Sequence, residues 1–175
     1  MPNTYSLISS NVLTSSAASV TFSAIPSTYT DLVLRTSTRI YVDGSTTSYP
    51  FNVSLNGTGT TSFSETLIRV SSTTNPSVRT TGQSAMTFNY TPAELATANT
   101  FASGEHYIPS YTASQNKPFS GVGHAPNNAL AGFMMDVNAG LYSSTSAVTS
   151  ITCWNASTFT FVAGSSFYLY GISNS

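Results

Sequence analysis

Hydrophobic and polar residues alternate with a period of two along much of the chain. In the segment 31–42 the even positions are Leu, Leu, Thr, Thr, Ile and Val, whereas Arg35 and Arg39 occupy odd positions. The segments 51–55 and 86–90 repeat the pattern, with aromatic or aliphatic residues at every second position. Successive side chains of a strand point to opposite faces, so each segment predicts a strand with one face toward a core.

The same reading extends to a set of roughly nine to eleven short strands. In the segment 51–55 we expect Phe51, Val53 and Leu55 to face inward, and Asn52 and Ser54 to face outward. Clusters of Ser, Thr, Gly, Asn and Pro separate the candidates. The remaining candidate strands are 19–22, 133–137, 158–162 and 167–172, with less regular ones at 5–13, 65–70, 106–111 and 148–154.

Local signals also predict turns and one short helix. The closely spaced glycines of 56–60 and 120–124 are typical of hairpin turns. A helix is expected near 92–98, because Thr91 and Glu94 have the spacing of a capping box and Pro92 suits the first helical position.

The fold class that follows is all-β. Many short strands, one short helix near 92–98 and a core rich in aromatic residues predict an antiparallel β-sandwich of the jelly-roll type. No repeat, linker or change in composition divides the chain, so residues 1–175 are expected to form a single domain. We expect the closing segment 167–172 to lie inside a sheet, with Gly171 permitting a bulge or the close approach of another backbone.

The charge content is unusually low. Asp, Glu, Lys and Arg make up 6% of the residues, against about 25% in ordinary soluble proteins, and Ser and Thr supply about a third of the chain. Such a surface is typical of a protein held in a permanent assembly or working outside a cell. Nucleic-acid binding is not expected, because phosphate contacts need clustered cations and these are dispersed: Arg35, Arg39, Arg69, Arg79 and Lys117.

Cysteine and apolar runs add little chemistry. Cys153 is the single cysteine, so it is predicted to be a small buried hydrophobic residue. The first ten residues lack the basic and apolar regions of a signal peptide, and no apolar run reaches the length of a membrane span. We therefore expect no membrane association and no cofactor.

Candidate catalytic and metal-binding residues are few. His106 and His124, together with Glu105 and Asp136, are a candidate metal site, but the spacing fits no compact ligand motif, and two unrelated histidines are the preferred interpretation. Glu65, Glu105 and Asp136 are carboxylates without an evident turn or capping role. They are too scattered to indicate a catalytic pair, so the chain is predicted not to be an enzyme, and polysaccharide cleavage is the least favoured alternative.

Tyrosine offers a different hypothesis. The chain has 10 Tyr and 10 Phe residues, and exposed rings on a β-sandwich can stack on the faces of sugars. Packing in the core or between subunits is the preferred interpretation, since interfaces are also enriched in tyrosine. The candidate glycan or interface aromatics near expected loops are Tyr41, Tyr49, Tyr107, Tyr111 and Tyr142.

Three longer segments carry a resemblance to a known family. Residues 15–39 read SSAASVTFSAIPSTYTDLVLRTSTR and contain the pattern F-x-x-I-P-x-x-Y-T-D-L-x-L, and the pattern continues through 106–121 and 144–173. The last segment closes with F-x-x-G-S-x-F-x-L-Y-G-I, and the three together cover about 70 of the 175 residues. In these phrases the chain resembles a family of small, functionally uncharacterised virion structural proteins of tailed bacteriophages, often marine ones.

The resemblance implies a virion component without a catalytic motif. The expected function is a capsid decoration (cement) protein that assembles as a homotrimer or a higher symmetric oligomer and contacts the major capsid protein or tail proteins. The alternative is a tail or fibre module that binds host surface glycans. The implied location is the virion, after synthesis in the cytoplasm of the bacterial host.

Overall fold

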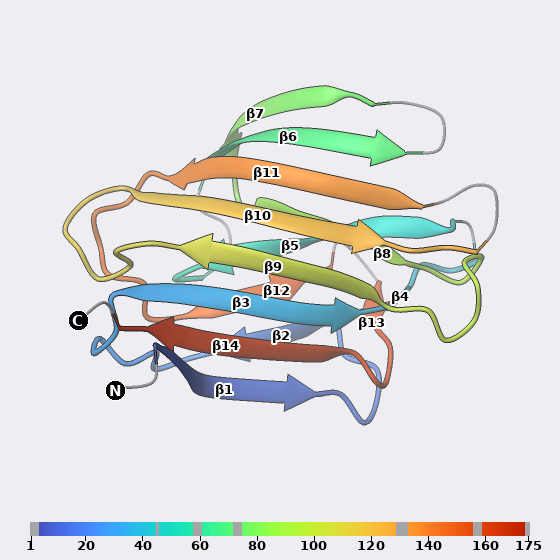
Figure 1. Ribbon diagram of the computed structural model, residues 1–175, viewed down its shortest axis with the longest axis horizontal. Coiled ribbons are helices and arrows are strands. Elements are labelled where there is room, and N and C mark those ends of the chain that lie inside the picture. The colour runs from blue at the N-terminus through green and yellow to red at the C-terminus, as the bar shows by residue number, and fades with distance from the viewer. Residues whose placement is uncertain are drawn as a thin grey trace.

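The protein is described by a computed structural model that covers residues 4–44, 46–57, 61–71, 75–128, 133–155 and 159–173. The regular elements in these ranges are all β-strands, and no helix occurs among them (Figure 1). The predicted all-β class is therefore confirmed. The strands are β1 (Tyr5–Val12), β2 (Ser19–Phe22), β3 (Asp31–Thr38), β4 (Ile40–Tyr41), β5 (Ser48–Leu55), β6 (Phe63–Ser71), β7 (Ser77–Gln83), β8 (Met86–Pro92), β9 (Ala102–Ile108), β10 (Lys117–Ala125), β11 (Met134–Tyr142), β12 (Ile151–Trp154), β13 (Thr160–Phe161) and β14 (Ser166–Ile172).

The strands form two stacked antiparallel sheets and a small two-stranded pair. The large sheet has the order β1-β14-β3-β9-β10-β11-β6-β7, and the small sheet has the order β2-β12-β5-β8. In Figure 1 the large sheet lies in front, with the small sheet behind it, and the start of β1 and the end of β14 lie on the same side. This arrangement is a β-sandwich. Because the sheets hold eight and four strands, the jelly-roll topology stays a prediction.

The core lies between the two sheets and follows the predicted alternation. In β3 the even-numbered Leu32, Leu34, Thr36 and Thr38 are buried, whereas Arg35 is exposed on the opposite face. The centre of the core is a group of aromatic rings in contact, formed by Phe51, Phe88, Phe161 and Phe167.

Two details of the predicted burial have clear outcomes. Ser54 faces outward as expected, because it pairs with Thr152 and lies on the face opposite the core residues Val53 and Leu55. It is nevertheless fully buried on that face, where the Nε1 group of Trp154 on the next strand donates a hydrogen bond of 2.7 Å to its hydroxyl. Cys153 is buried, as expected for a small hydrophobic residue.

The closing segment lies inside the large sheet, as predicted. Strand β14 pairs with β1 on one side and with β3 on the other. Gly171 allows a close approach, but by a side chain: a Cβ at this position would lie 2.2 Å from Cγ of Tyr29. The tyrosine ring therefore packs directly on the backbone of β14.

The predicted helix near 92–98 is wrong. Residues 93–100 form turns, and their carbonyl groups are bound by the side chain of Arg39. Its Nη2 donates to the carbonyl oxygens of Ala93 (2.7 Å) and Ala96 (3.2 Å), and its Nη1 donates to that of Thr97 (2.8 Å). The Glu94 carboxylate accepts a hydrogen bond from the backbone N–H of Val42. Tertiary partners therefore replace the local hydrogen bonds of a helix.

Neither glycine-rich stretch is a hairpin turn. Residues 120–124 lie inside β10, where a Cβ on Gly121 would lie 2.4 Å from the ring of His106 and one on Gly123 would lie 2.1 Å from Cβ of Asn89. These glycines make room for side chains packed against the sheet. Asn56 and Gly57 do turn the chain, with φ of 55° and 107°, but they lead out of the small sheet toward β6 of the large one, and residues 58–60 lie outside the described ranges.

Candidate functional site

The five tyrosines singled out from the sequence do not form one binding face. Tyr111 and Tyr142 are buried in the core, and Tyr142 stacks on Phe63 with ring centroids 4.7 Å apart. Tyr49 packs edge-on against Phe159. Tyr41 is exposed on β4.

Tyr107 has a structural partner. Its hydroxyl donates a hydrogen bond of 2.7 Å to Asp31, which also accepts one of 2.8 Å from the backbone N–H of Ser110. The bond to Asp31 and partial burial raise the pKa of Tyr107 to about 12. Asp31 thereby ties the loop after β9 to the start of β3.

The two histidines lie on opposite faces of the large sheet. His106 is buried between the sheets against Phe88, whereas His124 is exposed on the outer face. Within the described ranges, no three His, Cys, Asp or Glu side chains gather closely enough to hold a metal ion. The candidate site of His106, His124, Glu105 and Asp136 is therefore not assembled by this fold.

Two of the unassigned carboxylates meet at the edge of the small sheet. Glu65 on β6 and Asp136 on β11 are both buried, and both point toward β8, which is the edge strand of the small sheet. Both oxygens of Glu65 accept a hydrogen bond of 3.2 Å from the backbone N–H of Thr87. One oxygen of Asp136 accepts a bond of 3.0 Å from the backbone N–H of Tyr90.

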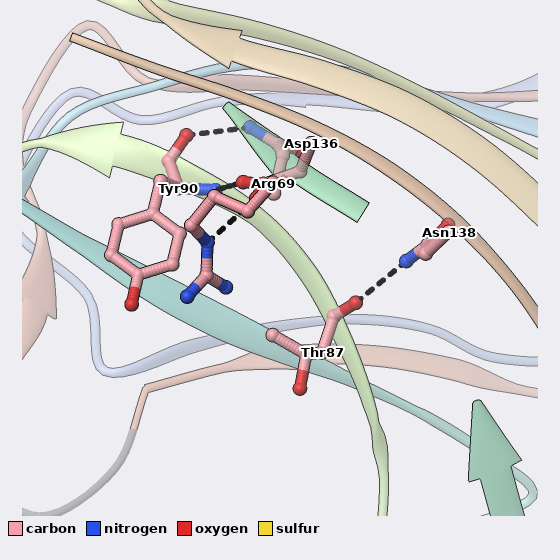
Figure 2. Close-up of polar contacts among 6 residues, drawn as sticks. Arg69, Thr87, Tyr90, Asp136 and Asn138 are labelled. Atoms are coloured by element: carbon pink, nitrogen blue, oxygen red, sulfur yellow. Dashed lines mark hydrogen bonds and ion pairs between the residues drawn. The ribbon is translucent and has the colours of Figure 1, made fainter. Parts of the chain in front are cut away.

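An amide and an arginine complete this cluster (Figure 2). The Asn138 side-chain amide donates a hydrogen bond of 2.8 Å to the carbonyl oxygen of Thr87. The Arg69 Nε donates one of 2.8 Å to the second oxygen of Asp136, and its guanidinium group lies 4.1 Å from the centroid of the Tyr90 ring. Two backbone donors and one acceptor of the edge strand β8 are thus satisfied by side chains of the facing sheet.

The electrostatics fit a structural role for these carboxylates. Burial raises the pKa of Glu65, and the hydrogen bond from Thr87 and the charge of Arg69 oppose the shift only in part. A depression of about 210 Å³ lies beside it, lined by residues that include Pro50, Leu67 and Thr80. Glu65 and Asp136 accept hydrogen bonds from backbone N–H groups of β8 and from Arg69, so the cluster joins the two sheets.

The sequence contained a signal for this cluster. Glu65 lies two residues after the core residue Phe63, and Asp136 and Asn138 lie six and four residues before the core residue Tyr142, so all three occupy inward positions of their strands. A polar residue at an inward position of a strand indicates a buried hydrogen-bond partner. The identity of that partner depends on how the two sheets stack, which lies beyond a local pattern.

A second surface feature lies on the outer face of the large sheet. Five apolar side chains, 41–55% exposed, form a continuous group across the three neighbouring strands β10, β11 and β6. Val137 pairs directly with Val122 on one side and with Ile68 on the other, and Met135 pairs with Val70. We call this group the outer apolar patch: Ile68, Val70, Val122, Met135 and Val137.

The comparisons with known proteins add no name to these features. Neither the protein-family models nor the curated protein sequences contain a match to this chain. Among the described residues, no helix is long and apolar enough to cross a membrane.

Proposed function

We propose that this chain is a non-enzymatic structural protein of a bacteriophage particle, with capsid decoration as its place in the particle. The observation that carries the proposal is the outer apolar patch, which leaves five apolar side chains exposed to water on the outer face of the large sheet. Groups of this kind mark surfaces that contact other proteins. The resemblance of the segments 15–39 and 144–173 to phage structural proteins points to a phage particle as the assembly in which these contacts are made.

The low charge of the chain supports the same proposal. With 6% charged residues, the protein has few ionic groups to oppose close packing against its neighbours. The partners that we propose are further copies of this chain, in a homotrimer or a higher symmetric oligomer, and the major capsid protein or tail proteins beneath it.

Sedimentation of the purified protein tests the self-association. We expect the wild-type chain to sediment as a symmetric oligomer and Val137→Glu to shift it toward the monomer, because the change places a charge at the centre of the patch. Ser120→Glu is the matched control, since Ser120 is exposed on the same face of β10 outside the patch. A wild-type protein that is monomeric at every concentration would remove the oligomer from the proposal.

A further inference from the structure

A second feature of the outer face is a shallow depression over β14, β3 and β9. It has a volume of about 220 Å³, and six of its lining residues point outward from these three strands. It shares no residue with the outer apolar patch, although Val122 of the patch pairs directly with Glu105 at its border. The outward-pointing lining residues are Arg35, Ser37, Ser103, Glu105, Ser166 and Tyr168.

The floor of the depression is a row of three serines. Ser37 on β3 pairs with Ser166 on β14 and with Ser103 on β9, so the three side chains lie next to one another across the sheet. Serine is small, which explains why the surface is hollow here. Each hydroxyl can both donate and accept a hydrogen bond.

The next row of residues forms a taller wall. Tyr168 pairs with Arg35, which pairs with Glu105, so an aromatic ring, a guanidinium group and a carboxylate stand side by side. Arg35 Nε donates a hydrogen bond of 2.6 Å to Glu105, and both side chains are about half exposed. A ligand in the depression would therefore meet donors and acceptors above a hydroxyl-lined floor.

The arginine is held in one orientation by its surroundings. Its guanidinium carbon lies 5.5 Å from the ring centroid of Tyr5 and 5.6 Å from that of Tyr170, on the side away from the serine row. The two rings and Glu105 fix the guanidinium from three sides. Such fixation lowers the entropy lost when a ligand binds.

We propose that this depression, named here the serine-floored depression, binds a neutral sugar unit of a polysaccharide. A sugar ring presents vicinal hydroxyls, which both donate and accept hydrogen bonds, and a C–H face, which packs on an aromatic ring. The serine row and the Arg35–Glu105 pair match the hydroxyls, and Tyr168 supplies the ring.

The charge of the wall favours a neutral ligand over an anionic one. Arg35 and Glu105 form an ion pair, so the wall carries no net charge. An acidic sugar would need a cation free to pair with it, and the lining residues of the depression contain no cation besides Arg35. None of the five tyrosines singled out from the sequence lines this depression, so it is a different candidate sugar site from the one that the sequence suggested.

Titration followed by NMR tests the proposal. The ¹⁵N-labelled full chain is titrated separately with D-glucose, D-galactose, D-mannose and N-acetyl-D-glucosamine. We expect saturable shifts for at least one sugar, centred on the backbone amides of Ser37, Ser103 and Ser166. Tyr168→Ala is expected to lower the affinity for that sugar about tenfold or more. Tyr41→Ala, which removes an exposed tyrosine on β4, is expected to leave the affinity unchanged.

A second variant guards against a change of fold. Ser103→Leu fills the floor from an exposed position, and we expect it to abolish the shifts while the rest of the spectrum stays that of the wild type. Absence of saturable shifts with all four sugars would overturn the proposal, as would shifts that map elsewhere or survive both variants. None of these results bears on the sedimentation of Val137→Glu, so this inference and the proposed function fail separately.

Discussion

The buried imidazole of His106 makes the stability of the protein depend on pH. His106 is buried between the sheets, with its ring centroid 3.6 Å from that of Phe88 and its ring against the backbone of Gly121. Burial lowers the pKa of His106 from 6.5 to about 3, and the nearby amide of Asn138 opposes this shift only in part. The imidazole is therefore neutral in the folded protein at every pH above about 3, whereas in the unfolded chain it takes up a proton below about 6.5.

The sign and size of the effect follow from this difference. Because the unfolded state binds the proton more tightly, stability is lost as the pH falls below 6.5 and the loss continues to about pH 3. One unit of pKa difference corresponds to about 1.36 kcal/mol. At pH 4.5, two units below the unfolded pKa, the contribution of His106 is a loss of about 3 kcal/mol relative to neutral pH.

Urea unfolding at a series of pH values between 7.5 and 4.5 measures this loss. In His106→Leu we expect about 3 kcal/mol less destabilisation over this pH range than in the wild type. Among the described residues neither ring nitrogen of His106 has a hydrogen bond of good geometry, so an apolar replacement leaves few partners unpaired. His106→Gln provides a second variant without an imidazole. His124→Asn removes the exposed imidazole and leaves His106 in place, so it retains the wild-type loss.

The comparison of the wild type with His106→Leu can refute the assignment of this pH dependence to His106. If the wild type and His106→Leu lose the same free energy of unfolding between pH 7.5 and 4.5, the imidazole of His106 is not held neutral by burial. A loss that disappears in His124→Asn would place the effect on the outer face of the sheet.

Three further predictions concern the same interior. Gly121→Ala puts a Cβ 2.4 Å from the ring of His106 and is expected to cost about 1–3 kcal/mol in urea unfolding, with a smaller cost in a His106→Ala background; equal costs in both would contradict the packing. In the wild type, the raised pKa of Glu65 favours the protonated carboxyl in the folded state, so the protein is expected to lose stability as the pH rises from 4.5. Glu65→Gln is expected to remove this loss, and parallel stability–pH profiles of the variant and the wild type would refute the prediction. Arg39→Ala frees the carbonyls of 93–100 and is expected to cost about 2–4 kcal/mol and to open this segment to limited proteolysis, whereas an unchanged cleavage pattern would show that the turns hold without it.

The strands were predictable because their signal is local. The alternation of β3 depends on adjacent residues alone, and the structure buries its even positions and exposes Arg35. The aromatic closing segment likewise indicated a strand packed inside a sheet, which β14 is. An alternation of period two can be recognised within a single segment, whereas the identity of the strand that pairs with this segment cannot.

The errors occurred where distant partners decide the structure. The capping-box signal at Thr91 and Glu94 is outweighed by Arg39 and Val42, which bind the polar groups that a helix would use. The glycines of 120–124 resemble a turn in sequence, yet they are glycines because His106 and Asn89, from other strands, occupy the space of a side chain. Stacking of the sheets sets these contacts, and a local pattern does not contain it.

The surface sites were only half predictable. Alternation places Arg35 on the outward face, but the row that joins it to Tyr168 and Glu105 depends on the register between three strands. The five apolar residues of the outer apolar patch come from segments that are far apart in the sequence, and the sheet order brings them together. The tyrosines expected in loops were misleading because two of them, Tyr111 and Tyr142, fill the core.

The copy number of this chain in purified phage particles tests the proposed function most directly. Quantitative mass spectrometry of the particles, with the major capsid protein as the internal reference, supplies the ratio. Our account predicts a copy number of the same order as that of the major capsid protein, since a decoration protein covers the whole shell. A handful of copies would contradict capsid decoration and place the chain in the tail or a fibre, and absence from the particle would contradict the virion function itself.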